Sequence, residues 1–284
     1  MAIRMRLLVL PQQPDSSGSV LLGDKEYRYL AQVLRKVAGD SIEARLPDGT
    51  LCAMCITSID RKEKQIRLSV ISRTVATSHM AETSCEAGAS MPAISGLGEN
   101  FPSIVLFQWM LKGPKMDQVI RQATEAGVSV IVPVAGERCL SANAEDVGGG
   151  KTGRWDRIVR EALQQCGSPV PTRVLSPVDG SEIPSLWRSL GGPVSRSVVL
   201  TEAPLARISL HEYLCTGTGS TAIAIGPEGG MTAREIGILV ESGFTCIHFK
   251  TNILRAETAA LYGIAAVQSA LLESENWQLK ESIS

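Results

Sequence analysis

Short apolar runs alternate with amphipathic segments along the chain after residue 101. Over Lys115–Ala126 the apolar positions recur every three or four residues, which predicts a helix with one buried face. Strands alternating with helices are typical of a mostly parallel sheet covered by helices, so an α/β domain is expected here. The pattern places strands at Ser103–Trp109, Val128–Val134, Ser197–Thr201, Ala222–Gly226 and Thr245–Phe249, and further helices at Arg154–Cys166 and Ala256–Leu272.

Residues 1–74 have a different pattern, in which short strands dominate. Pro47-Asp48-Gly49-Thr50 separates two of them and has the composition of a hairpin turn. One helix is expected over Lys25–Lys36, where apolar residues recur at helical spacing. A small β-rich domain, a barrel in our interpretation, is therefore predicted, with strands at Arg6–Leu10, Ser41–Leu46, Leu51–Ile59 and Gln65–Ile71.

Residues 75–101 separate these two patterns. They are rich in Ser, Thr, Ala, Gly and Met and show little periodicity, which predicts a linker. The expected organisation is thus a small domain over 1–74, a linker over 75–101 and an α/β domain over 102–284.

Charge distinguishes the two parts of the chain further. The net charge of the 284 residues is −1, which argues against a uniformly basic nucleic-acid-binding protein. Residues 1–74 nevertheless carry a balance of +4, and the remainder carries −5. This distribution is compatible with RNA contact by the N-terminal part and equally with an ordinary solvated surface.

The seven cysteines are odd in number and scattered, which indicates reduced thiols and a cytoplasmic protein. Cys52-Ala-Met-Cys55 is a lone Cys-x-x-Cys without the second pair that a zinc site requires, so packed thiols and no metal site are expected. No apolar run reaches about 18 residues, and the apolar N-terminal stretch is too short for a signal peptide. No membrane association is therefore expected.

Gly226-Pro-Glu-Gly-Gly230 is the most informative motif in the chain. It follows an apolar strand and precedes a helix start, where Thr232 and Glu235 have the spacing of a capping box. Ligands bind at this place in open α/β sheets, and glycines let the backbone approach a ligand closely. The spacing matches neither of the two common glycine-rich nucleotide-binding motifs.

A second motif, Ile253-Leu254-Arg255-Ala256-Glu257-Thr258-Ala259, follows the last predicted strand. The two motifs together closely resemble the RsmE family of 16S ribosomal RNA uridine-N3 methyltransferases, in the SPOUT superfamily. The resemblance implies a C-terminal trefoil knot in the α/β domain, although general rules of chain topology argue against knots. It also implies that residues 1–74 are a PUA-like RNA-binding domain, in which Tyr29-Leu-Ala-Gln-Val-Leu-Arg35 matches a family motif with Tyr29 where His is common.

The resemblance further implies S-adenosylmethionine as the cofactor. In the family, the glycine-rich loop and the loop before the second motif surround it, and the end of the Ser197–Thr201 strand adds a third wall. The residues expected to bind the cofactor are Leu200, Thr201, Glu202, Gly226, Pro227, Glu228, Gly229, Gly230, Phe249, Asn252, Ile253 and Leu254.

Two residues of the second motif are the catalytic candidates. Methylation at N3 of uridine requires loss of the N3 proton or stabilisation of the resulting anion, and Arg255 fits that electrostatic role. Glu257 would orient Arg255 or contact substrate or cofactor, and Glu228 would act as base only if it reached N3. The structural alternative is an Arg255–Glu257 ion pair at a helix start, worth less than about 1 kcal/mol if exposed.

Basic residues outside these motifs are candidates for RNA contact. Lys112 and Lys115 lie in a Lys-Gly-x-x-Met-Asp block, and Arg138 follows a strand end, where a guanidinium can bind phosphate with two hydrogen bonds. The alternative for each is a solvated turn or the charged outer face of a helix. The expected RNA-binding residues are Arg35, Lys112, Lys115, Arg138, Arg154 and Arg157.

The chain departs from the family at two positions of the second loop. Lys250 occupies a position where glycine is common in the family. A lysine would be strained there if the backbone has positive φ. Asn252 stands where Arg is common.

The expected function is methylation of N3 of a uridine in the decoding region of 16S rRNA, in the small ribosomal subunit, by a homodimer. The alternatives are a SPOUT methyltransferase with another target, such as ribose 2′-O, or a non-catalytic RNA-binding ribosome-assembly factor.

Overall fold

The computed structural model describes residues 8–74, 102–139, 150–191, 195–202, 206, 208–214 and 219–274. The chain divides into two compact units, Met1–Ala81 with Leu163–Pro169 and Glu82–Ala162 with Val170–Ser284. The predicted linker 75–101 and the first two residues of the predicted strand Arg6–Leu10 lie outside the described residues. The boundaries of the three predicted segments stay a prediction.

The first unit contains a five-stranded sheet in the order β1-β3-β4-β5-β2. All neighbours in it are antiparallel except β1 and β3, and the turn at residues 47–50 joins β3 to β4 as the sequence predicted. Its inward-facing side chains form one core that includes Leu8, Met54 and Leu68. The strands are β1 (Leu8–Val9), β2 (Ser19–Leu22), β3 (Ser41–Arg45), β4 (Leu51–Asp60) and β5 (Gln65–Thr74).

The helix expected over Lys25–Lys36 is shorter and wider than predicted. It begins as α1 (Asp24–Tyr27) and continues as the π-helical turn η1 (Arg28–Val33). The backbone N–H of Leu34 donates to the carbonyl of Tyr29 at 2.9 Å, five residues earlier, and Arg35 then takes a φ of +53° that ends the helix. The wider turn directs both Tyr27 and Leu30 into the core, a tertiary effect that periodicity alone does not reveal.

The second unit is the expected α/β domain. Its sheet has the order β12-β10-β11-β6-β7-β8, β9 also pairs with β7, and every pair is parallel. Strand ends agree with the prediction to within about two residues. The strands are β6 (Ile104–Trp109), β7 (Val130–Ala135), β8 (Arg173–Val174), β9 (Val178–Asp179), β10 (Arg196–Leu200), β11 (Thr221–Ile225) and β12 (Thr245–Ile247).

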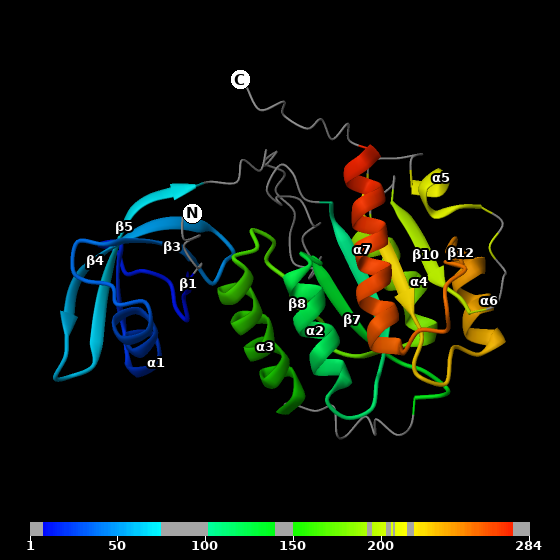
Figure 1. Ribbon diagram of the computed structural model, residues 1–284, viewed down its shortest axis with the longest axis horizontal. Coiled ribbons are helices and arrows are strands. Elements are labelled where there is room, and N and C mark those ends of the chain that lie inside the picture. Colours follow the sequence, from blue (N-terminus) through cyan, green and yellow to red (C-terminus); the bar gives the residue numbers. More distant parts are fainter. Residues whose placement is uncertain are drawn as a thin grey trace, which may run out of the picture. The chain divides into compact units, whose positions relative to one another are not determined.

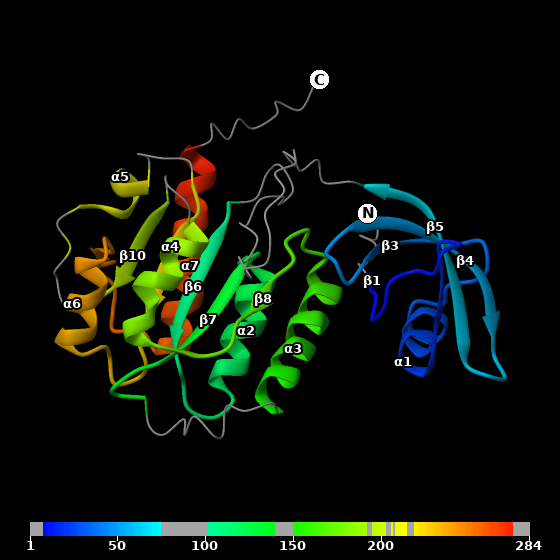
Figure 2. The ribbon, with the colours of Figure 1, turned by 180° about the vertical axis from the view of Figure 1, so that it is seen from behind.

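Helices cover both faces of this sheet. Figure 1 shows α2 and α7 on one face, and Figure 2 shows α4 on the other. The predicted helices were found close to their expected bounds, whereas α4 and α5 were not predicted from the sequence. The helices are α2 (Lys115–Glu125), α3 (Gly150–Cys166), the 3₁₀ turn η2 (Gly180–Glu182), α4 (Ile183–Gly191), α5 (Leu210–Leu214), α6 (Ala233–Glu241) and α7 (Ala256–Ser274).

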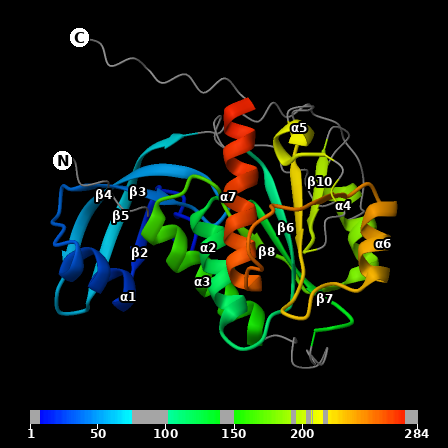
Figure 3. The ribbon, with the colours of Figure 1, turned by 45° about the vertical axis from the view of Figure 1, so that its right-hand side comes forward.

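Burial follows from this layering. Strands β6 and β11 are buried along their whole length, because helices cover both sides of them. Phe107 in β6 makes edge-to-face contacts with Trp187 and Phe244, with ring centroids 6.3 and 6.1 Å apart. Helix α7 begins near the lower end of the sheet in Figure 3 and runs back across it, burying Ala260, Ile264 and Val267. The carboxyl ends of the parallel strands and the start of α7 therefore meet at one end of the domain.

This fold confirms the expected mostly parallel sheet and the small N-terminal β domain. The trefoil knot stays a prediction. No helix among the described residues is long and apolar enough to cross a membrane. The described part of the chain also contains no cluster of three or more potential metal-binding side chains. Cys52 and Cys55 both lie on β4, where Cys52 is buried in the core of the first unit.

Candidate functional site

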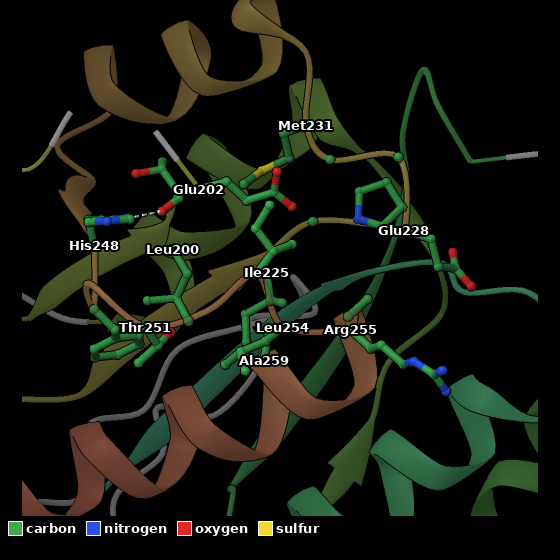
Figure 4. A pocket seen from close by; sticks show the side chains of 18 of the residues that line it. Leu200, Glu202, Ile225, Glu228, Met231, His248, Thr251, Leu254, Arg255 and Ala259 are labelled. Atoms are coloured by element: carbon green, nitrogen blue, oxygen red, sulfur yellow. Dashed lines mark hydrogen bonds between the residues drawn. The ribbon is translucent and has the colours of Figure 1, made fainter. Parts of the chain in front are cut away.

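A cavity of about 600 Å³ lies where the carboxyl ends of β10, β11 and β12 meet the start of α7. Parallel strands bring their carboxyl ends to one edge, so segments far apart in sequence form a single site. Figure 4 shows Leu200, Ile225, Leu254 and Ala259 gathered above α7, with Glu228 and Arg255 to one side and His248 to the other. The structure brings together all twelve expected cofactor-binding residues, because each of them lines this cavity.

The glycine-rich loop forms one wall of the cavity. Gly230 has a φ of +66°, in the left-handed region that favours glycine, and its N–H donates to the carbonyl of Pro227 at 2.9 Å. A Cβ atom on Gly226 would lie 3.1 Å from Cγ and 3.2 Å from the backbone nitrogen of Met231. A larger residue would therefore be strained at Gly230 by the backbone conformation, and at Gly226 it would press against Met231.

Glu235 fixes this loop to the rest of the domain. The predicted capping box is present: Thr232 N–H donates to Glu235 Oε2 at 2.7 Å, and Glu235 N–H donates to Thr232 Oγ1 at 3.2 Å. Glu235 Oε1 also accepts from Trp109 Nε1 at 2.8 Å and from the N–H of Glu137 at 3.1 Å. Burial by itself raises the pKa of this carboxyl, but these hydrogen bonds outweigh it and hold the pKa below its usual value.

The segment after β12 forms the opposite wall. Thr201 N–H donates to the carbonyl of Ile247 at 3.0 Å, and Nδ1 of His248 lies 3.0 Å from the carbonyl oxygen of Thr201. A ring nitrogen facing a carbonyl oxygen must carry a proton, so His248 donates here. Hydrogen bonds of Thr201 thus join the end of β10 to the segment that begins the second loop, a link that the sequence motif did not reveal.

Lys250 in this loop has a φ of +51°, so the residue that replaces the common family glycine sits in left-handed backbone. A side chain in that region is strained, and glycine is not. We expect Lys250→Gly to stabilise the protein by roughly 0.5–1 kcal/mol, seen as a higher denaturant midpoint with an unchanged slope.

Two variants in the β4–β5 turn serve as controls for this prediction. Lys64 also has a φ of +51°, so Lys64→Gly should give a similar gain, while Lys62→Gly, where φ is not positive, should give none. A lower midpoint for Lys250→Gly would contradict the strain argument.

Arg255 is placed as the sequence predicted, at the mouth of the cavity and at the start of α7. Its carbonyl accepts from the N–H groups of Thr258 and Ala259, which begins the helix. The guanidinium points away from the apolar part of the cavity in Figure 4, and the side chain is exposed. Among the described residues it forms no ion pair with Glu257, which argues against the helix-start alternative.

Glu257 is buried and does not line the cavity. Its Oε2 lies 3.6 Å from Nζ of Lys115, and the same ammonium lies 3.1 Å from Oε1 of Glu228. Glu228 Oε1 also accepts from the N–H of Lys112 at 3.2 Å. Partial burial raises the pKa of Glu228, but its hydrogen bonds with Lys115 and the backbone outweigh this and lower the pKa, which makes Glu228 a weak base.

The expected RNA-binding residues divide into two groups. Lys115 and Arg138 line the cavity, and Arg138 Nη1 donates to the carbonyl of Gly229 at 2.9 Å. On α3, Arg154 is paired with Asp117, and Arg157 Nε lies 3.9 Å from Oε1 of its neighbour Glu161. Lys112 does not line the cavity, and Arg35 belongs to the first unit. RNA contact by this set stays a prediction.

Several cavity residues were missed from the sequence. Ala256 and Ala259 lie inside the second motif but were not chosen. The others belong to neither motif, and their only signal was their position next to residues already chosen or one helical turn away from them. The missed residues are Ile225, Met231, Ile236, His248, Thr251, Ala256 and Ala259.

Comparison with known proteins is consistent with this geometry. Residues 99–268 match the family model of an RNA methyltransferase domain, and residues 22–69 match that of an RNA methyltransferase PUA domain. The chain is 28% identical to ribosomal RNA small subunit methyltransferase E 2 of Borreliella burgdorferi, over 96% of this chain and 100% of that protein. It is 25% identical to ribosomal RNA small subunit methyltransferase E of Bacillus subtilis, over 93% of this chain and 96% of that protein.

Solved structures with the same fold include a ribosomal RNA small subunit methyltransferase E from Neisseria gonorrhoeae bound to S-adenosylmethionine. Its TM-score is 0.69 at 24% identity, over 94% of this chain and 98% of that one. A Legionella pneumophila protein, also solved with S-adenosylmethionine, gives a TM-score of 0.68 at 22% identity, over 94% and 98% of the two chains.

Proposed function

This chain belongs to the RNA methyltransferase family, and on that premise we propose that it transfers a methyl group from S-adenosylmethionine to ribosomal RNA of the small subunit. The observation that carries the proposal is the cavity formed by the glycine-rich loop and the Phe249–Leu254 loop at the carboxyl ends of the parallel strands. Curated relatives that align over nearly the whole chain are named small-subunit ribosomal RNA methyltransferases, which supports ribosomal RNA as the substrate class.

The cavity residues fit such a cofactor. A volume of about 600 Å³ lies within the usual range of small-molecule sites, and the apolar floor of Leu200, Ile225 and Leu254 suits an aromatic base. The glycine-rich loop lines the cavity and leads into a helix start, and glycines let the backbone approach the polar atoms of a ligand closely. When bound, S-adenosylmethionine supplies an electrophilic methyl group on a positively charged sulfur.

We further propose N3 of a uridine in the decoding region of 16S rRNA as the acceptor. Uridine N3 must lose its proton before it can accept a methyl group, and the negative charge then spreads onto O2 and O4. The exposed guanidinium of Arg255 lies at the cavity mouth, where it can stabilise that charge. Glu228 is a weak base because of its ion pair, so we assign the electrostatic role to Arg255 and no base role to Glu228.

RNA binding is assigned to the first unit and to the basic residues Lys112, Arg138, Arg154 and Arg157. The match of residues 22–69 to a PUA domain supports this assignment.

We also propose that the protein acts as a homodimer in the cytoplasm. The exposed apolar side chains of Ile253, Leu261 and Tyr262, on and beside the start of α7, support a subunit contact there.

The proposal is tested by incubating the protein with labelled S-adenosylmethionine and small ribosomal subunits that lack N3-methyluridine, followed by nucleoside analysis. Labelled 3-methyluridine is the expected product. Label in another nucleoside, such as a ribose 2′-O-methylated one, would support methyltransferase activity but contradict uridine N3 as the acceptor. Absence of label, together with absence of cofactor binding by a folded protein, would favour the non-catalytic assembly factor instead.

A further inference from the structure

Lys115 joins the two walls of the cavity. It is the first residue of α2, and its ammonium lies 3.1 Å from Glu228 in the glycine-rich loop and 3.6 Å from Glu257 at the start of α7. Lys115 is more than a hundred positions away from both Glu228 and Glu257 along the chain, so only the fold brings the three residues together. One flexible cation therefore connects α2 with both segments that form the cavity.

Each carboxylate depends on this cation. Glu257 is 9% exposed, and its Oε2 is buried without a hydrogen-bond partner, so the ammonium of Lys115 is the charge that faces it. Glu228 accepts from Lys115 and from the N–H of Lys112. Without the ammonium, two negative charges would face the same point with little compensation, and the loop and the helix start would repel each other.

We propose that Lys115 is a positioning residue that holds the glycine-rich loop against the start of α7, and so keeps the cofactor cavity in its binding shape. This rests on the proposed use of the cavity for S-adenosylmethionine. Lys115 acts through Glu228 and Glu257, which changes its expected role from RNA contact to organisation of the site. Its ion pairs are partly exposed, so the effect lies in the geometry of the cavity and much less in global stability.

Other charged groups around the cluster do not replace Lys115. Within the described part of the chain, none of the neighbouring cations forms an ion pair with Glu228 or Glu257. On α2, Asp117 is already paired with Arg154. From the β7 loop, Arg138 donates to the carbonyl of Gly229. Burial raises the pKa of the Cys139 thiol, and the carboxylates of Glu235 and Glu228 raise it further. At the start of α7, Arg255 is exposed.

The test measures the dissociation constant of S-adenosylmethionine by calorimetry for the wild type, Lys115→Met and Lys115→Arg. At about pH 7.5 we expect Lys115→Met to bind roughly tenfold more weakly, while Lys115→Arg binds within about threefold of the wild type. The double variant Lys115→Met with Glu228→Gln should recover most of the lost affinity, because removing one carboxylate relieves the repulsion.

The pH dependence separates this role from a purely structural one. In Lys115→Met, Glu228 loses the ion pair that helps to lower its pKa, so the pKa of Glu228 rises. A second titration at about pH 5.5 should therefore show a smaller deficit relative to the wild type, because Glu228 is protonated more readily there. The matched control Lys62→Met removes a lysine from the β4–β5 turn and should bind as the wild type does.

The outcomes are distinct. Absence of binding by the folded wild type would overturn the proposed function, and this inference with it. Binding by the wild type with equal affinity in Lys115→Met would overturn the inference alone. A deficit that is the same at both pH values, or that Glu228→Gln does not relieve, would also overturn it. If Lys115→Met does not fold, the affinity of the double variant for S-adenosylmethionine is compared with that of Glu228→Gln alone. That comparison tests the same role of Lys115.

Discussion

Arg255→Ala is expected to lower kcat for methyl transfer by about 10²- to 10³-fold, the usual loss when one preorganised group that stabilises a developing anion is removed. The affinity for S-adenosylmethionine should change little, because the guanidinium points away from the apolar floor where Leu200, Ile225 and Leu254 gather. Helix α7 should still begin at the same place, since Arg255 starts it through its backbone carbonyl and not through its side chain.

The measurement combines single-turnover methyl transfer to small subunits with calorimetric titration of the cofactor. Arg255→Lys should recover part of the rate, because an ammonium keeps the charge but cannot donate two parallel hydrogen bonds. Arg188→Ala, which removes an exposed guanidinium from α4, is the matched control and should leave kcat unchanged. A normal kcat for Arg255→Ala, or a loss confined to cofactor affinity, would contradict the assigned role.

Glu235→Ala is expected to destabilise the protein by roughly 2–4 kcal/mol, because it leaves one buried and two partly buried donors without an acceptor. The carboxylate accepts from Thr232, Trp109 and Glu137, which belong to three different segments. The apparent melting temperature should fall by roughly 5–10 °C, and cofactor affinity should fall as well, since the capping box begins directly after the glycine-rich loop. Glu241→Ala, at the exposed end of the same helix, is the control and should have little effect.

The pH dependence of this contribution has a definite sign. The folded-state pKa of Glu235 lies below its ordinary value, so the unfolded chain binds the proton more tightly. The stabilisation is fully present above the unfolded-state pKa of roughly 4.5 and is lost as the pH falls through the lower folded-state value. Urea unfolding of the wild type and Glu235→Gln should therefore differ most near neutrality and converge in acid. A constant difference down to about pH 3 would contradict the assignment.

Local sequence signals predicted much of this fold because they act over a few residues. The apolar runs that became β6 and β11 are buried on both faces, and the Thr232–Glu235 spacing produced the expected capping box. The hairpin turn at 47–50 also formed where its composition indicated. Where tertiary packing competes with periodicity, the prediction was incomplete, as in the π-helical turn after Tyr27.

The candidate site shows the same division. The two motifs, the loop before the second of them and the end of the Ser197–Thr201 strand supplied the residues chosen for cofactor binding, and all of these residues line one cavity. The partners of the charged residues were not predictable, because an ion pair depends on distance in space and not in sequence. Lys115 faces Glu228 and Glu257, two partners that the sequence did not indicate, and its expected contact with RNA stays a prediction. His248, which carries no motif, joins the end of β10 to the second loop through the carbonyl of Thr201.

The sequence by itself determined the two kinds of domain, the parallel sheet, the glycine-rich loop and the arginine at the helix start, since each depends on residue type and local spacing. Only the tertiary structure decided which charges meet. Parallel strands bring their carboxyl ends to one edge, so Glu235 reaches Trp109 and Glu137, and Lys115 reaches two carboxylates that lie far away along the chain. The strain at Lys250 likewise became visible only once the backbone placed it at a φ of +51°.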